Sequence, residues 1–236
     1  MRCFWETVST VAIEDGGGHG VALDSRPIKT PARHVLRVPT AALAAAIAEE
    51  WRGQGETVEP ATMPQMKFAC TAIDRVALQR EAVIDAIAVF AGTDLLCYRA
   101  DDPPALVDRQ RAHWQPVLDW AAVRFDAALD ITTGVVPVRQ SAAALAAVRR
   151  AVAANNDMCL AALHAVTSVA GSVVLGLALV DGRLDAARVS EASLLDERFQ
   201  AERWGEDDEA TARRAALEAE IANVACFLTL LKTPQA

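Results

Sequence analysis

The chain has 236 residues, of which 53% are hydrophobic and 23% charged, with a formal net charge of -8 at pH 7. These proportions are typical of a globular chain with one or two domains and exclude a disordered tail. Nucleic-acid binding needs a clustered positive face, so an acidic chain with no run of basic residues is not expected to bind nucleic acid. The N-terminus has no basic stretch followed by an apolar segment, so we expect a cytoplasmic rather than a secreted protein.

The first forty residues alternate between apolar and polar positions in short runs separated by turn residues, which is typical of strands. We expect an antiparallel sheet with strands at residues 8–14, 21–23, 28–30 and 34–38, joined by turns at 16–20 and 24–27. Thr40 then caps a helix over residues 41–54, which can cover one face of the sheet.

After residue 60 the strand signals nearly vanish, and apolar residues recur at helical spacing between Pro and Gly. We expect helices at 64–78, 80–91, 104–125, 141–154, 158–180, 185–204 and 208–231. The predicted fold is therefore α+β. A small β-rich domain with one covering helix spans 1–60, and a larger all-helical domain spans 61–236.

The segment 158–180 carries no charged residue and is long enough to span a bilayer. His164, Thr167 and two serines interrupt it, and no interfacial aromatic belt or basic flank accompanies it. We therefore interpret it as a central helix buried by its neighbours and expect no membrane insertion. Gly171 and Gly176 inside this helix are interpreted as close helix contacts rather than as a nucleotide loop.

No cofactor or metal is expected. The glycine cluster at 16–20 lacks the Lys-Ser/Thr ending of a phosphate loop, and the histidines and cysteines lack metal-ligand spacing. Ser168 lies one helical turn from His164, but no strand-turn-helix elbow surrounds it, so a serine hydrolase is rejected.

Acidic residues crowd the segment around Trp204-Gly205, and two explanations stay open. They cap and solvate two helix ends, or they join Phe199 and Trp204, both expected to be exposed, in a binding face for a basic partner. An enzyme that uses paired carboxylates as acid and base is the alternative, and it would need the acids to converge in a deep cleft. The acids are Glu191, Asp196, Glu197, Glu202, Glu206, Asp207, Asp208 and Glu209.

Several short motifs in a fixed order resemble the assembly chaperones of the ATP synthase α subunit, a family that includes mitochondrial F1 complex assembly factor two and its bacterial relatives. The resemblance covers nearly the whole chain. It rests on Phe4-Trp5, residues 23–31, Glu50-Trp51, Met63-Pro64, residues 71–75, residues 93–99, Gln110, Trp114, Pro116, residues 195–197 and residues 199–207. Ser25 departs from the family turn, which more often has Gly.

The resemblance implies a non-catalytic chaperone that binds the free α subunit of F1-ATPase and prevents its aggregation before α/β assembly, without a nucleotide. It also implies a cytoplasmic location in bacteria and a mitochondrial one in eukaryotic relatives. An acidic residue of the C-terminal signature is implicated in function, and we assign that role first to Glu202. Further expected partner-binding residues are Asp196, Glu197, Glu206, Phe199 and Trp204, and the free chain is expected to be monomeric.

Overall fold

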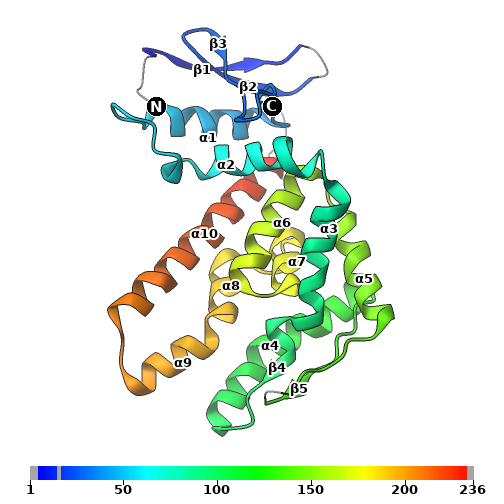
Figure 1. Ribbon diagram of the computed structural model, residues 1–236. Coiled ribbons are helices and arrows are strands. Elements are labelled where there is room, and N and C mark those ends of the chain that lie inside the picture. The colour runs from blue at the N-terminus through cyan, green and yellow to red at the C-terminus, as the bar shows by residue number, and fades with distance from the viewer. Residues whose placement is uncertain (1–4, 15–16, 135, 233–236) are drawn as a thin grey trace. The chain divides into compact units, whose positions relative to one another are not determined.

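The computed structural model describes residues 5–14, 17–134 and 136–232 (Figure 1). Two members of the predicted motifs, Phe4 and Gly16, lie outside these residues. The chain divides into two compact units: the first comprises Met1–Arg80, Asp157–Ala162 and Cys226–Ala236, and the second comprises Glu81–Asn156 and Leu163–Ala225. The predicted α+β class is confirmed, and a domain boundary after residue 60 stays a prediction.

A three-stranded antiparallel sheet forms the start of the first unit (Figure 1). The central strand is β2, whose consecutive residues Val21, Ala22 and Leu23 are all buried, so both faces of this strand are covered. The strands are β1 (Val8–Ala12), β2 (His19–Leu23) and β3 (Arg26–Pro27).

The strands predicted at 28–30 and 34–38 are wrong as continuous strands. Pro31 has no N–H to donate, and Arg33 has a φ of 69°, so the chain turns within this segment and breaks the ladder. Two isolated antiparallel bridges remain, His19 with Val38 and Lys29 with Val35.

The turn between β2 and β3 has two residues, Asp24 and Ser25, with φ values of 46° and 67°. Two positive φ values define the tight turn that fits the twist of a hairpin, and glycine is favoured at its second position. The Asp24 carboxylate also accepts hydrogen bonds from the backbone N–H groups of Glu6 and Thr7, both at 2.9 Å. These bonds fasten the turn to the start of β1.

We expect Ser25→Gly to raise the free energy of unfolding by about 0.5 kcal/mol. A left-handed conformation costs a residue with a Cβ about 1 kcal/mol, and the larger conformational freedom of glycine in the unfolded chain offsets part of that gain. Denaturant unfolding of both proteins measures the difference. A lower midpoint for the glycine variant would contradict the strain assigned to this turn.

Helix α1 (Ala41–Arg52) covers the sheet with its buried face, and its start and cap confirm the prediction made from Thr40. The Thr40 hydroxyl accepts the N–H of Leu43 at 3.2 Å and donates to the carbonyl of Leu230 at 2.8 Å. The Glu50 carboxylate accepts the N–H groups of Gln65 and Met66, at 2.6 and 2.8 Å, at the start of the next helix. Glu50 thereby caps α2 (Pro64–Thr71) from a neighbouring helix.

The segment after α2 is a π-helix rather than the continuation of an α-helix, because the Ala77 N–H reaches the carbonyl of Ala72 at 3.0 Å. Within it, Asp74 holds the loop of residues 30–34. Its carboxylate accepts bonds from the Thr30 hydroxyl at 2.6 Å and the Ala32 N–H at 3.0 Å, and it lies 2.8 Å from His34 Nδ1. The short helices of this unit are η1 (Pro60–Thr62) and the π-helix η2 (Ala72–Val76).

Helices make up most of the remaining chain, with α6 and α10 shared between the two units. In chain order, these helices and the short segments between them are α3 (Arg80–Ala88), η3 (Val89–Thr93), η4 (Leu95–Cys97), β4 (Tyr98–Arg99), α4 (Pro104–Phe125), β5 (Thr132–Thr133), α5 (Ala142–Ala153), α6 (Asp157–Ala170), α7 (Val173–Asp181), α8 (Ala186–Ser193), α9 (Leu195–Trp204) and α10 (Asp208–Lys232).

Two predicted helices are each divided in the structure. The helix predicted at 158–180 is interrupted because Gly171 has a φ of 66°, and the Ser172 hydroxyl accepts the Leu175 N–H at 3.0 Å to begin α7. The helix predicted at 185–204 is interrupted at Leu194, between α8 and α9. In contrast, α4 has the predicted bounds. The parallel strand pair β4–β5 was not predicted, because a strand of two residues is too short to show an alternation of apolar and polar residues.

The core of the second unit forms where α4 packs against α7 and α9. Trp114 on α4 is fully buried, donates from its indole nitrogen to the carbonyl of Ala192 at 2.8 Å, and lies under the Arg99 guanidinium. No helix within the described residues is both long and apolar enough to cross a membrane. Most residues of the apolar segment 158–180 are buried, which confirms the prediction that it forms core.

Candidate functional site

The acidic segment of the sequence forms α9, a three-residue connection and the start of α10. Gly205, with a φ of 95°, ends α9, and the Asp207 carboxylate accepts the Ala210 N–H at 3.0 Å at the start of α10. The capping role predicted for this part of the acidic segment is confirmed for Asp207. The four acids predicted to bind the partner, Asp196, Glu197, Glu202 and Glu206, have other contacts.

Glu202 projects from α9 and pairs with Arg109 of α4. One guanidinium nitrogen donates to both carboxylate oxygens, at 2.8 and 2.9 Å, and these hydrogen bonds lower the pKa of Glu202. The Glu202 side chain is 56% exposed and the Arg109 side chain 38% exposed, so water screens the ion pair. An ion pair of this kind adds little to folding and can exchange its partner when another protein binds.

Asp196 and Glu197, in the first turn of α9, are tied to other helices. Asp196 is half-buried and accepts a hydrogen bond from the Gln110 side-chain amide at 2.8 Å, and burial raises its pKa. Gln110 also accepts the N–H of Ala100 at 2.8 Å, so it joins three segments. Glu197 pairs with Arg213 at 2.8 Å. The geometry of these two acids fits a structural role.

Glu206 lies in the connection after α9 and faces α10. It accepts hydrogen bonds from the Thr211 hydroxyl at 2.6 Å and from the Arg214 guanidinium at 2.8 Å. Arg214 is only 9% exposed, so its charge is largely removed from water, and Glu206 compensates for it. Glu206 thus fixes the end of α9 against α10 while its own side chain stays in solvent.

The two aromatic residues of α9 differ in exposure, and the prediction that both are exposed is wrong for Phe199. Phe199 is 4% exposed because its face of α9 packs on α4. Two guanidinium groups cover its ring, Arg109 at 5.2 Å and Arg203 at 4.7 Å from the ring centroid. Trp204, by contrast, is 77% exposed.

We define the α9 face as the exposed side chains of Glu202, Arg203, Trp204 and Glu206 together with Arg109. Sequence reasoning named its acids and Trp204 but missed Arg203 as a member. The signal was present, since Arg203 lies four positions after Phe199 and therefore on the same side of a helix. The face combines one exposed aromatic ring with charges of both signs.

The enzyme alternative needs carboxylates that converge in a cleft with raised pKa values. Glu202, Glu197 and Glu206 each pair with an arginine instead, and the pKa of Glu202 is lowered. Burial raises the pKa of Asp196, but its hydrogen-bond partner is the Gln110 amide and not a second carboxyl group. Ser168, the other candidate nucleophile, donates to the carbonyl of His164 at 2.8 Å rather than to an imidazole nitrogen. The geometry therefore favours a binding surface.

Comparisons with known proteins agree on one family. A family model described as "ATP12 chaperone protein" matches residues 2–122. The crystal structure of Atp12 from Paracoccus denitrificans is 45% identical, with a TM-score of 0.92 and a coverage of 98% of both chains. A point mutant of P. denitrificans Atp12p is 44% identical with the same TM-score and coverage. A protein from Agrobacterium tumefaciens is 40% identical with a TM-score of 0.91, covering 97% of this chain and 85% of its own.

Proposed function

We propose that this chain, which belongs to the ATP12 chaperone family, binds the free α subunit of F1-ATPase through the α9 face. Members of this family assist F1-ATPase assembly by binding the α subunit and are not enzymes. The contact surface on this chain is the new element of the proposal. The alternative of a carboxylate enzyme loses its basis, because Glu202, Glu197 and Glu206 each pair with an arginine and Asp196 accepts from the Gln110 amide.

The observation that carries the proposal is the exposure of Trp204, 77% of whose surface faces solvent at the end of α9. An indole ring in water gains most by burial against a partner, and Trp and Arg are the residues that most often dominate binding energy. Arg203 and the Arg109–Glu202 pair border it with charges that the partner can recognise. An aromatic anchor with a polar border fits reversible binding.

Reversibility matters because a chaperone must release its client. The α9 face has a single large exposed aromatic side chain, and Arg109, Glu202 and Glu206 already have ionic partners, so binding at these three residues exchanges ion pairs rather than burying unpaired charges. We expect moderate affinity as a result. The β subunit can then displace the chaperone from the α subunit.

We expect Trp204→Ala to weaken binding of the α subunit about tenfold or more, since truncating an aromatic anchor removes the buried area that it supplies. Glu202→Gln removes one charge with little change in shape, so we expect a loss of several-fold that diminishes at high salt. Capture of recombinant F1 α subunit on the immobilised chain, at two salt concentrations, measures both effects.

Controls come from an exposed apolar residue and an exposed acid that lie outside the α9 face. Val123→Ala truncates an apolar side chain that is 89% exposed on α4, and Glu209→Gln neutralises an exposed acid on α10. Both are expected to bind like the parent chain. Parental affinity in Trp204→Ala and Glu202→Gln would remove the α9 face from the proposal. Failure of the parent chain to capture the α subunit would refute the function itself.

The relatives with solved structures come from bacteria, which supports a bacterial cytoplasmic location for this chain. We also propose that the free chain acts as a monomer, because a chaperone surface used for self-association would be unavailable to its client. Light scattering of the purified chain at several concentrations measures its mass. A constant dimeric mass would contradict this part of the proposal.

A further inference from the structure

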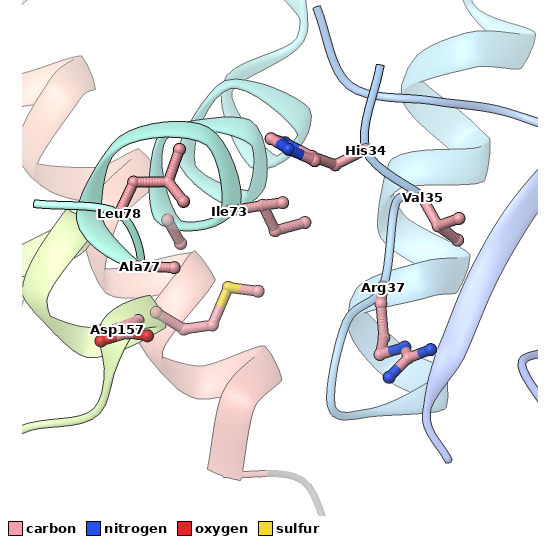
Figure 2. Close-up of a pocket in the computed structure, with 9 residues that line it drawn as sticks. His34, Val35, Arg37, Ile73, Ala77, Leu78 and Asp157 are labelled. Carbon is pink, nitrogen blue, oxygen red and sulfur yellow. The ribbon is translucent and has the colours of Figure 1, made fainter. Parts of the chain in front are cut away.

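A second surface lies in the first unit, apart in sequence from the α9 face. It is an open cavity of about 370 Å³, drawn in Figure 2. Val35 comes from the segment after the sheet, Ile73 and Leu78 from η2 and the turn after it, and Met158 from the start of α6. Val35 is 46% and Leu78 66% exposed, so the cavity has an apolar rim that no part of the described chain covers.

The backbone beside this cavity has unused hydrogen-bonding groups. Around the bridge between Lys29 and Val35, the Thr30 N–H donates to the His34 carbonyl at 2.9 Å and the Leu36 N–H donates to the Ile28 carbonyl at 3.3 Å. In this antiparallel pattern the N–H and C=O of Val35 point away from the bridge. Neither group has a partner within the described residues. The segment is therefore an open strand edge, which another extended chain can extend by pairing.

The charge of this segment differs from that of the whole chain. Residues 26–37 contain four exposed basic residues and no acidic one, although the chain carries a net charge of -8. Lys29 lies directly opposite Val35, so its side chain is on the same face of the sheet as the cavity wall. The basic residues are Arg26, Lys29, Arg33 and Arg37.

Two acids at or beside the cavity already have partners. Asp74 accepts hydrogen bonds from Thr30 and Ala32 and contacts His34, and Asp157 pairs with Arg80. Lys29, opposite Val35, therefore places a positive charge on the face of this segment that adjoins the apolar lining of the cavity. A complementary ligand has a large apolar side chain next to an acidic residue.

We infer that the cavity and the open edge at Val35 bind an extended segment of the α subunit in which a large apolar side chain neighbours an acidic one. The apolar side chain enters between Val35, Ile73 and Leu78, and the backbone of the segment pairs with Val35. The acidic side chain lies over Lys29. This inference rests on the proposed function, because it takes the α subunit as the partner, and it adds a contact surface on the first unit.

The test uses the full chain and recombinant F1 α subunit. Ala77→Trp fills the cavity from its wall, and Leu78→Glu places an acidic side chain at its rim. Both positions are exposed, so neither substitution disturbs the core. We expect each to weaken binding at least tenfold. Val123→Glu, at a residue 89% exposed on α4, is the matched control and is expected to stay within twofold of the parent. Thermal unfolding of each variant verifies the fold.

The charge of the rim is tested separately. Lys29→Glu is expected to weaken binding at low salt by about tenfold and to reduce the salt dependence, and Arg139→Glu, an exposed reversal in the second unit, is expected to have no such effect.

Amide hydrogen exchange reports on the strand edge directly. The free N–H of Val35 is expected to exchange rapidly in the chain alone and to become at least tenfold slower when the α subunit is bound, because it then donates to the added strand. Parental binding in Ala77→Trp and Leu78→Glu, or unchanged exchange at Val35, would overturn the inference and leave the α9 face as the binding surface. If the parent chain does not bind the α subunit, both proposals fail together.

Discussion

Asp94→Ala is expected to lower the free energy of unfolding by about 3 kcal/mol at pH 7, because it leaves several buried donors without an acceptor. Asp94 is fully buried and precedes η4 as its N-cap, and its carboxylate reaches the start of α7. Its carboxylate accepts the N–H of Leu96 at 3.1 Å and the N–H of Val174 at 3.2 Å, and it receives further hydrogen bonds from the Ser172 hydroxyl and the Val173 N–H. One side chain thus fastens η4 to the N-terminus of α7.

The pH dependence of this loss follows from the raised pKa of Asp94. Burial raises the pKa of its carboxyl from 3.8 to about 6, although the hydrogen bonds act to lower it. A folded pKa above the unfolded one means that stability is greatest below pH 4 and is lost as the pH rises through 6. Between pH 7 and pH 5 the parent chain should therefore gain about 1 kcal/mol relative to Asp94→Ala.

Urea unfolding at pH 5 and pH 7 measures both effects. Asp94→Asn keeps the shape but turns an amide NH2 toward backbone donors, so an intermediate loss without the pH slope is expected. Asp101→Ala, at an exposed aspartate in the same unit, is the control and should change stability by less than about 0.5 kcal/mol. A parental unfolding midpoint in Asp94→Ala would contradict the role assigned to this carboxylate.

The sequence predicts those parts of the fold whose signals are local. Pro103-Pro104 and the helical spacing that follows predict the bounds of α4 that the structure shows. Thr40 likewise predicts the start of α1. The division of 158–180 was missed because apolar residues continue on both sides of Gly171-Ser172. Glycine is a signal for the end of a helix and serine a signal for the start of one. The pair Gly171-Ser172 therefore predicts two helices here, despite the continuous apolar run.

The site depends on contacts that sequence spacing does not contain. Phe199 is buried because α9 packs on α4, and the residue that pairs with Glu202 is Arg109, 93 positions earlier. The short α9 has charged residues on every side, so no apolar stripe indicated which face would turn inward. Composition gave the sign of the charges, whereas tertiary packing decided which of them remain available to a partner.

Gly176→Ala is expected to destabilise the chain by about 2 kcal/mol, even though alanine is the better helix former by about 1 kcal/mol. A Cβ at this position would lie 2.6 Å from Thr167 Oγ1 and 2.9 Å from Leu163 Cδ1, both on α6. These contacts are shorter than packed atoms allow, and both side chains are fully buried, so the surrounding helices must shift. The prediction that small residues allow close helix contact is confirmed at Gly176.

A second substitution identifies the cause of that loss. The Thr167 hydroxyl has no hydrogen-bond partner within the described residues, so Thr167→Ala removes the closest atom without breaking a hydrogen bond. We expect it to cost about 1 kcal/mol alone and to recover at least 1 kcal/mol in the Gly176→Ala background, giving a favourable coupling energy in denaturant unfolding. Gly182→Ala is the control. A Cβ at Gly182 would have no neighbour within 4 Å, but the residue has a φ of 80°. Its substitution is therefore expected to lower stability through backbone strain, by an amount that does not depend on Thr167. Additive effects of the two substitutions at 167 and 176 would assign the loss to the backbone of α7 instead of the contact with α6.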